Sequence, residues 1–218
     1  MKIKICGLRR KEDIDYVNLW RPDMVGFVFA GVKRRIDYET AKMLKKNLNP
    51  EMKAVGVFVN ADMEYIDRLV ADDIIDIVQL HGDEDEAYIQ SLRRSFRQMG
   101  KQDTPVIKAV RVKSTEQVLA AERLPVDYLL LDAFTEEEYG GSGKVFNHAL
   151  IPNLEKPYLL AGGIDCNNVV EIIDSLKEKN VTLPFCIDVS SSVEVDGYKD
   201  EDKILSLIHI SEPTRLRC

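Results

Sequence analysis

The sequence lacks any apolar run approaching the roughly 20 residues that cross a bilayer. Its first residues, MKIKICGLRR, also lack the apolar segment of a signal peptide. We therefore expect a cytoplasmic protein with no membrane partner. Basic residues are in the minority, since 30 Lys and Arg stand against 37 Asp and Glu, for a net charge of −7. Binding to nucleic acid needs clustered positive charge, so we expect no nucleic acid partner.

Cysteine and histidine are scarce, with four and three residues. The cysteines form no CxxC pair and have no histidine at the spacing of metal ligands, which disfavours both a disulfide framework and a zinc site. We therefore predict no metal. The single Trp also leaves no aromatic stripe on which single-stranded nucleic acid could stack.

Short apolar, β-branched segments recur along the 218 residues and predict eight strands in one domain. The segments are KIKIC (2–6), MVGFVF (24–29), AVGVFV (54–59), IDIVQL (75–80), VIKAV (106–110), YLLLD (128–132), YLLAG (158–162) and FCIDVS (185–190).

Between these strands, apolar residues return every three or four positions, as they do in helices, over 38–48, 63–70, 84–96 and 169–176. Strands that alternate with helices pair in parallel, and eight such units in about 200 residues are typical of a single (β/α)8 TIM barrel, an α/β fold. An open doubly wound sheet is the alternative. Its dinucleotide-binding form needs GxGxxG after the first strand, where this chain has Gly7-Leu8-Arg9.

The last residues do not follow this pattern. A final helix begins over 200–207, but residues 208–218 lose the amphipathic spacing and contain Pro213. They resemble translated adapter or vector sequence. We therefore assign residues 1–205 to the barrel domain and expect residues 206–218 to be a non-native or disordered tail.

The C-terminal ends of the barrel strands are where chemistry is expected. Side chains alternate along a strand, so Lys4 and Cys6 point into the barrel and Cys6 lies at its mouth. A lone cysteine in a strand is most often a small buried hydrophobe. At the mouth, however, the Cys6 thiol could act as a base if its pKa were lowered.

Three further polar residues lie at strand ends. Asp132 closes the most apolar strand and is either a turn or helix cap, or a general acid whose pKa is raised in a water-poor cleft. Asp188 is either a structural hydrogen-bond acceptor or a site residue. His81 shares a strand face with Gln79, and we expect it to position substrate at most, because a lone histidine is more often a satisfied polar group.

Two loops are candidates for binding phosphate. Gly162-Gly163 follows the seventh strand and leaves its backbone N–H groups accessible to an anion. Ser190, Ser191 and Ser192 follow the eighth strand and add hydroxyls. Many barrels bind phosphate with the loops after these two strands.

The segment 139–144, YGGSGK, is similar to a nucleotide-binding loop but does not match one. The pattern GxxxxGK[ST] would need glycine where Glu138 stands and Ser or Thr where Val145 stands. A mobile lid over the sixth strand is the better interpretation.

Taken together, these segments resemble the phosphoribosylanthranilate isomerase family, in order from residue 3 to about 205. The matching motifs are KICG (4–7), GFVF (26–29), VGVFVN (55–60), VQLHG (78–82), LLLD (129–132), EYGGSGK (138–144), AGGI (161–164) and IDVSSSVE (187–194).

The resemblance implies a ribulose-phosphate-binding barrel that carries out an Amadori rearrangement of a phosphorylated, aminated ribose. Asp132 would protonate the furanose ring oxygen, and Cys6 would remove the C2′ proton. Arg34 would meet the anthranilate carboxylate, a task that suits a planar guanidinium. The Gly162-Gly163 amides and the loop after Ser190 would hold the phosphate. No cofactor is implied, because the substrate nitrogen serves as electron sink.

Two positions depart from the family pattern. Val32 stands where a serine is common, and Ser192 stands where the family commonly has DVSSGVE. If that glycine takes a positive φ, serine there costs about 1 kcal/mol. These departures support one alternative, a phosphosugar-binding barrel without activity. Another phosphosugar isomerase or epimerase is the second alternative, and we expect a monomer in each case.

Overall fold

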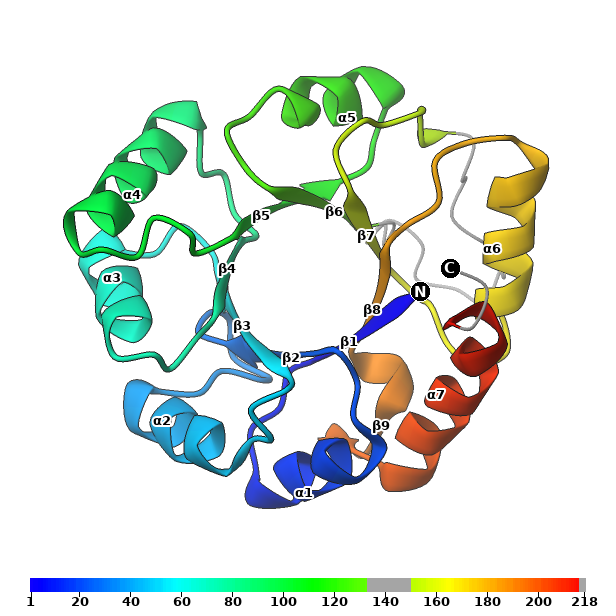
Figure 1. The fold of residues 1–218 in the computed structure, drawn as a ribbon. Coiled ribbons are helices and arrows are strands. Elements are labelled where there is room, and N and C mark those ends of the chain that lie inside the picture. Colours follow the sequence, from blue (N-terminus) through cyan, green and yellow to red (C-terminus); the bar gives the residue numbers. More distant parts are fainter. Residues whose placement is uncertain (133–149, 216–218) are drawn as a thin grey trace.

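The computed structural model describes residues 1–132 and 150–215, with the side chains of 211–215 left out. Eight strands close into one parallel barrel in sequential order, and Figure 1 shows the helices arranged around this ring. The (β/α)8 prediction is confirmed. The strands are β1 (Lys2–Cys6), β2 (Met24–Val28), β3 (Lys53–Phe58), β4 (Ile77–Leu80), β5 (Val106–Arg111), β6 (Tyr128–Asp132), β7 (Tyr158–Ala161) and β8 (Cys186–Val189).

Helices lie between most of the strands, and four of them fall on the segments 38–48, 63–70, 84–96 and 169–176, whose apolar spacing predicted helices. The helices are α1 (Lys11–Trp20), α2 (Tyr38–Asn47), α3 (Met63–Ala71), α4 (Glu86–Gln98), α5 (Thr115–Glu122), α6 (Val169–Glu178) and α7 (Glu201–Arg215). Helix α4 begins two residues later than predicted, because the Asp85 side chain caps it by accepting from Tyr88 N over 2.8 Å. Glu84 instead accepts from the backbone N–H groups of Asn60 and Gly82.

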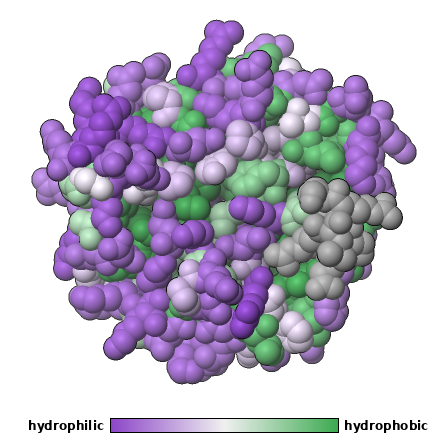
Figure 2. Space-filling model, in the orientation of Figure 1, coloured by the Kyte–Doolittle hydropathy of each residue, from purple (hydrophilic) through white to green (hydrophobic). Residues whose placement is uncertain are grey.

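Alternate residues of the strands fall into two apolar clusters. One cluster, which includes Met24, Val55 and Leu130, fills the barrel, and the other lies between the strands and the helices. Both faces of each strand are therefore buried, which is why the strands are almost continuously apolar in sequence. Polar strand residues that point into this apolar interior, such as Lys4 and Asp188, are therefore exceptions that need partners. At the surface, by contrast, polar residues cover most of the face in Figure 2.

A short hairpin follows β8 and the 3₁₀ turn η2 (Ser191–Val193). Its strands are β9 (Glu194–Val195) and β10 (Tyr198–Lys199), which pair antiparallel with Glu194 opposite Lys199. Asp196 and Gly197 between them have φ of 51° and 78°. Positive φ at both central residues is typical of the tight type I′ turn that Asp-Gly favours. The hairpin thus brings two charged residues side by side next to β8.

Helix α7 continues across residue 205 to Arg215, and Leu207 and Ile208 are buried against the rest of the molecule. The rings of Trp20 and His209 lie 6.2 Å apart in an edge-on contact. The domain boundary at 205 and the foreign origin of the tail stay predictions. In residues 1–132 and 150–215, no helix combines the length and apolar character needed to cross a membrane.

Candidate active site

The C-terminal end of the barrel collects the side chains that the sequence indicated. Cys6 ends β1, Asp132 ends β6 and Asp188 lies in β8. His81 directly follows β4, and Arg34 lies in the loop between β2 and α2. The glycine and serine loops after β7 and β8 open at the same end. A cavity of about 680 Å³, lined by Lys2, Met24 and Ile77 among others, lies at the opposite end, where the strands begin.

Cys6 occupies space that a glycine leaves open. Gly26 of β2 pairs with Cys6 across the ladder, and a Cβ on Gly26 would lie 2.7 Å from the Cys6 sulfur. Burial raises the pKa of the Cys6 thiol, while the ammonium groups of Lys4 and Lys199 oppose that rise. From the sequence, Cys6 was a candidate base only if its pKa were lowered. In the structure the pKa of Cys6 is raised instead. The thiol is mainly protonated at neutral pH.

Lys4 and Asp188 form an ion pair inside the barrel. Lys4 Nζ lies 2.9 Å from Asp188 Oδ1, and the two side chains are 0% and 9% exposed. Burial favours the neutral amine, but Asp188 and Cys6 outweigh it, so the pKa of Lys4 rises above its ordinary value. The sequence indicated that Lys4 points inward but gave it no role. Its partner Asp188 is thus a structural acceptor that also lies at the mouth.

His81 connects Gln79 with Asp132. The Gln79 amide nitrogen donates to His81 Nδ1 over 3.0 Å, so the ring proton belongs on Nε2, which lies 3.4 Å from Asp132 Oδ2. Gln79 is buried, and its Oε1 has no hydrogen-bond partner among the described residues. The arrangement directs Nε2 of His81 at Asp132, the candidate acid.

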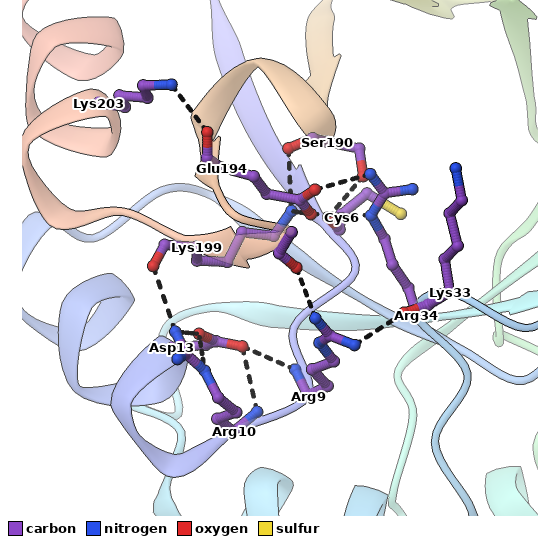
Figure 3. Close-up of polar contacts among 11 residues, drawn as sticks. Cys6, Arg9, Arg10, Asp13, Lys33, Arg34, Ser190, Glu194, Lys199 and Lys203 are labelled. Carbon is purple, nitrogen blue, oxygen red and sulfur yellow. Dashed lines mark hydrogen bonds and ion pairs between the residues drawn. The ribbon is translucent and has the colours of Figure 1, made fainter.

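Arg34 forms a bidentate pair with Glu194, and Glu194 also pairs with Lys199 (Figure 3). Neither Glu194 nor Lys199 has a function predicted from the sequence. Glu194 lies within the IDVSSSVE motif, but nothing in the sequence indicated that residue 194 meets residue 34. Arg35, the neighbour of Arg34, is exposed.

The candidate phosphate loops differ in their hydrogen bonds. Gly162 and Gly163 both have positive φ, at 95° and 68°. Ser190 Oγ donates to the Cys6 carbonyl over 3.0 Å, whereas Ser191 is exposed. Ser192 Oγ is buried and has no partner among the described residues. Because Ser192 is not among the residues with positive φ, the backbone strain considered for a serine at this position is absent.

In the described part of the chain, no group of three or more His, Cys, Asp or Glu is arranged to hold a metal ion. Cys6, Cys166 and Cys186 are free thiols. The glycine-rich segment 139–144, interpreted from sequence as a lid, lies outside the described residues.

Polar and ionisable side chains gather at the C-terminal ends of the strands of this (β/α)8 barrel. This arrangement is the architecture of a barrel enzyme. The sequence model of the family described as N-(5'phosphoribosyl)anthranilate (PRA) isomerase matches residues 3–209. The chain belongs to this family, which confirms the resemblance found in its motifs.

Individual relatives agree with this assignment. The N-(5'-phosphoribosyl)anthranilate isomerase of Endomicrobium trichonymphae is 44% identical over 209 residues, covering 96% of this chain and 97% of the relative. The crystal structure of the Thermotoga maritima isomerase has a TM-score of 0.80 at 32% identity, covering 98% of this chain and 99% of the other. A further isomerase structure, in complex with reduced 1-(o-carboxyphenylamino)-1-deoxyribulose 5-phosphate, has a TM-score of 0.76 at 29% identity and covers 98% and 99%.

Proposed function

We propose that this chain isomerises N-(5-phosphoribosyl)anthranilate to 1-(2-carboxyphenylamino)-1-deoxyribulose 5-phosphate, an Amadori rearrangement in L-tryptophan biosynthesis. The observation that carries the proposal is the family match over residues 3–209, which spans all eight strands and so includes every candidate site residue. The other phosphosugar barrels considered above have no comparable support.

In this reaction Asp132 acts as the general acid and Cys6 as the base. Asp132 donates a proton to the furanose ring oxygen while the bond from that oxygen to C1′ breaks and the nitrogen lone pair forms an iminium. The Cys6 thiolate then removes the proton from C2′, and the electron pair of that C–H bond forms the enol-amine. Tautomerisation places a proton on C1′ and leaves a ketone at C2′. The substrate nitrogen accepts the electrons, so the proposed step uses no cofactor.

The side chains around this pair support the two roles. Asp132 and Cys6 end strands on different sides of the mouth, because β7 and β8 separate β6 from β1 in the ring. A substrate between them could be protonated at one atom and deprotonated at another. His81 Nε2 lies 3.4 Å from Asp132 Oδ2 and positions this carboxyl, and Lys4 next to Cys6 favours the thiolate. A raised thiol pKa makes the thiolate scarcer but a stronger base.

The substrate's two anionic ends are assigned to different groups at the mouth. Arg34 meets the anthranilate carboxylate, and the loops at Gly162-Gly163 and at Ser190, Ser191 and Ser192 meet the phosphate. The Ser192 hydroxyl, which has no partner among the described residues, supports the second assignment, since a buried hydroxyl without a partner costs about 1–3 kcal/mol that a phosphate oxygen would recover. His81 and Asp188 border the sugar between the two ends.

The fluorescence of anthranilate-type compounds tests the activity directly. Freshly generated phosphoribosylanthranilate is mixed with the purified chain and, in parallel, with Asp132→Ala. We expect rapid loss of fluorescence with the wild type and slow loss with the variant. If the folded wild type shows no loss but binds the reduced product analogue, the chain is a phosphosugar-binding barrel without turnover.

We further propose that the chain works in the cytoplasm as a monomer. A similar solved isomerase from Thermotoga maritima is described as dimeric, so the monomer needs its own measurement. Light scattering coupled to size exclusion should give a mass close to 24.8 kDa, and a mass near twice that value would contradict the proposal.

A further inference from the structure

Glu194 and Lys199 are buried charged residues that the proposed chemistry does not use. They lie opposite each other on the β9–β10 hairpin, with side chains 7% and 1% exposed. Lys199 Nζ donates to Glu194 Oε1 over 2.6 Å. Taking two charges out of water is costly unless each is well paired and hydrogen-bonded. What these two residues hold in place is therefore informative.

Glu194 holds Arg34. The Nε and Nη2 atoms of Arg34 donate to the two carboxylate oxygens of Glu194 over 2.8 and 2.7 Å, as Figure 3 shows. A bidentate pair sets both the plane and the rotation of a guanidinium, and it leaves Nη1 outside the pair. The stem of Arg34 lies so close over Gly7 that a Cβ there would be 2.5 Å from Arg34 Cδ. The guanidinium is thus confined to one orientation.

Lys199 connects this pair to the loop after β8. Its Nζ also donates to the Ser190 carbonyl over 2.9 Å, and Ser190 Oγ donates to the Cys6 carbonyl. One connected set of bonds therefore runs from Arg34 through Glu194 and Lys199 to Ser190 and the end of β1. The residue assigned to the substrate carboxylate and the loop assigned to the phosphate are held by the same buried pair.

A second residue clamps the same two segments from outside. Arg9 donates to the Gly197 carbonyl in the hairpin turn over 2.6 Å and to the Lys33 carbonyl over 2.8 Å. The guanidinium of Arg9 also lies 4.2 Å from the centre of the Tyr198 ring. Because Lys33 directly precedes Arg34, this clamp keeps the backbone that carries Arg34 against the hairpin that carries Glu194 (Figure 3).

We propose that Glu194 and Lys199 are positioning residues that orient Arg34 toward the substrate carboxylate and couple it to the phosphate loop. The inference rests on the proposed function, in which Arg34 meets that carboxylate. Glu194 acts through Arg34 and does not touch the substrate. Its loss should therefore weaken recognition of the carboxylate specifically, and leave the proton transfers at Cys6 and Asp132 largely intact.

Two ligands separate this role from a merely structural one. The first is the reduced product, 1-(o-carboxyphenylamino)-1-deoxyribitol 5-phosphate, and the second is the same molecule without its carboxylate. Calorimetry on the full chain gives the ratio of their affinities. We expect Glu194→Gln to reduce this ratio on the order of tenfold, with affinity for the second ligand nearly unchanged. KM should rise by a similar factor while kcat changes little.

The matched control is Glu51→Gln, which removes a carboxylate from an exposed pair with Arg21 and should leave the ratio unchanged. Arg34→Met should abolish most of the ratio. If Arg34→Met lowers the ratio but Glu194→Gln keeps it, the inference is overturned while the proposed function stands. If Arg34→Met keeps it, the carboxylate role of Arg34 fails and the inference with it. Failure of the wild type to bind either ligand contradicts the proposed function itself.

A conservative variant covers the case in which Glu194→Gln does not fold. Glu194→Asp keeps the charge but is one methylene shorter, so it cannot hold Arg34 and Lys199 in the same geometry. We expect an intermediate loss of the ratio, and an unchanged ratio would overturn the inference. Lys199→Met should in addition weaken binding of the ligand that lacks the carboxylate, because it releases the Ser190 carbonyl.

Discussion

Lys4 and Asp188 meet inside the barrel, with Nζ 2.9 Å from Oδ1, although 184 residues separate them in sequence. The contact exists because β1 and β8 close the barrel and place Lys4 beside Asp188 in the ladder. The buried pair is surrounded by groups proposed to act on substrate. The contact that forms when β1 and β8 close the barrel therefore also places a charged pair next to the proposed site.

Lys4→Met should destabilise the protein strongly. Removing one partner of a buried ion pair leaves an uncompensated charge and costs about 3–5 kcal/mol, which urea unfolding followed by circular dichroism would measure. The control is Lys11→Met, which breaks an exposed pair with Asp15 and should have no measurable effect. Equal effects of the two substitutions would show that the buried pair does not stabilise the barrel.

Cys6→Ala and Asp132→Ala should each lower kcat by at least about a hundredfold, because each removes one partner of acid–base catalysis. Both variants should fold normally, as judged by circular dichroism. Cys166→Ala removes a different free thiol and should keep wild-type kcat. Wild-type turnover in either site variant would remove that residue from the mechanism.

The raised pKa of Cys6 gives the pH dependence a definite sign. Burial favours the protonated thiol, so the fraction of thiolate grows as pH rises. In Asp132→Ala, which has no general acid left to lose its proton, a thiolate base should make kcat/KM increase from pH 7 toward pH 9, by up to about tenfold per unit. A flat or falling profile would contradict a Cys6 base. The Lys4→Arg variant keeps the positive charge beside Cys6 and is the matched comparison. It should leave this increase of kcat/KM with pH nearly unchanged.

Gly26→Ala should impair both catalysis and stability, because the added Cβ would lie 2.9 Å from Cys6 Cα, a backbone atom that cannot move without shifting β1. The added Cβ would lie 2.7 Å from the Cys6 sulfur, so the thiol must move. A displacement of about 1 Å at a reacting group can cost on the order of a hundredfold. We expect kcat to fall with KM little changed in steady-state assays. Unchanged kcat would show that the thiol tolerates displacement.

The role of the Ser192 hydroxyl can be tested with two substitutions that both remove it, one to alanine and one to glycine. If the hydroxyl binds phosphate, Ser192→Ala should raise KM several-fold, which corresponds to about 1 kcal/mol for a lost hydrogen bond. Ser192→Gly restores the residue common in the family and should raise KM similarly. Increased thermal stability of Ser192→Ala with unchanged KM would mean that the buried hydroxyl is only an unsatisfied group.

Sequence patterns indicated the eight strands well because both faces of each one are buried, which leaves apolar segments that local spacing reveals. They were less exact at the ends of elements. The fourth strand was expected from residue 75 but begins at Ile77, and α4 begins after its Asp85 cap. Ends depend on individual hydrogen bonds, such as those of Glu84 to two loop amides, and apolar periodicity does not report them.

For the site, alternation along β1 and position at the strand ends made Cys6 and Asp132 candidates, and the family resemblance supplied their proposed roles. The partners of the site residues were not accessible in this way. Arg34 and Glu194 are 160 residues apart, and neither the Arg34–Glu194 pair nor the Gln79–His81–Asp132 contacts follow from local spacing.

The sequence by itself determined the order of the strands and the barrel class, because these properties follow from local alternation of apolar and polar residues. Only the tertiary structure decided which charges are paired and what the environment does to them. Burial raised the pKa of Cys6, and closure of the ring joined Lys4 to Asp188. Desolvation and ion pairing depend on distances between segments far apart in the chain, which only the closed barrel sets.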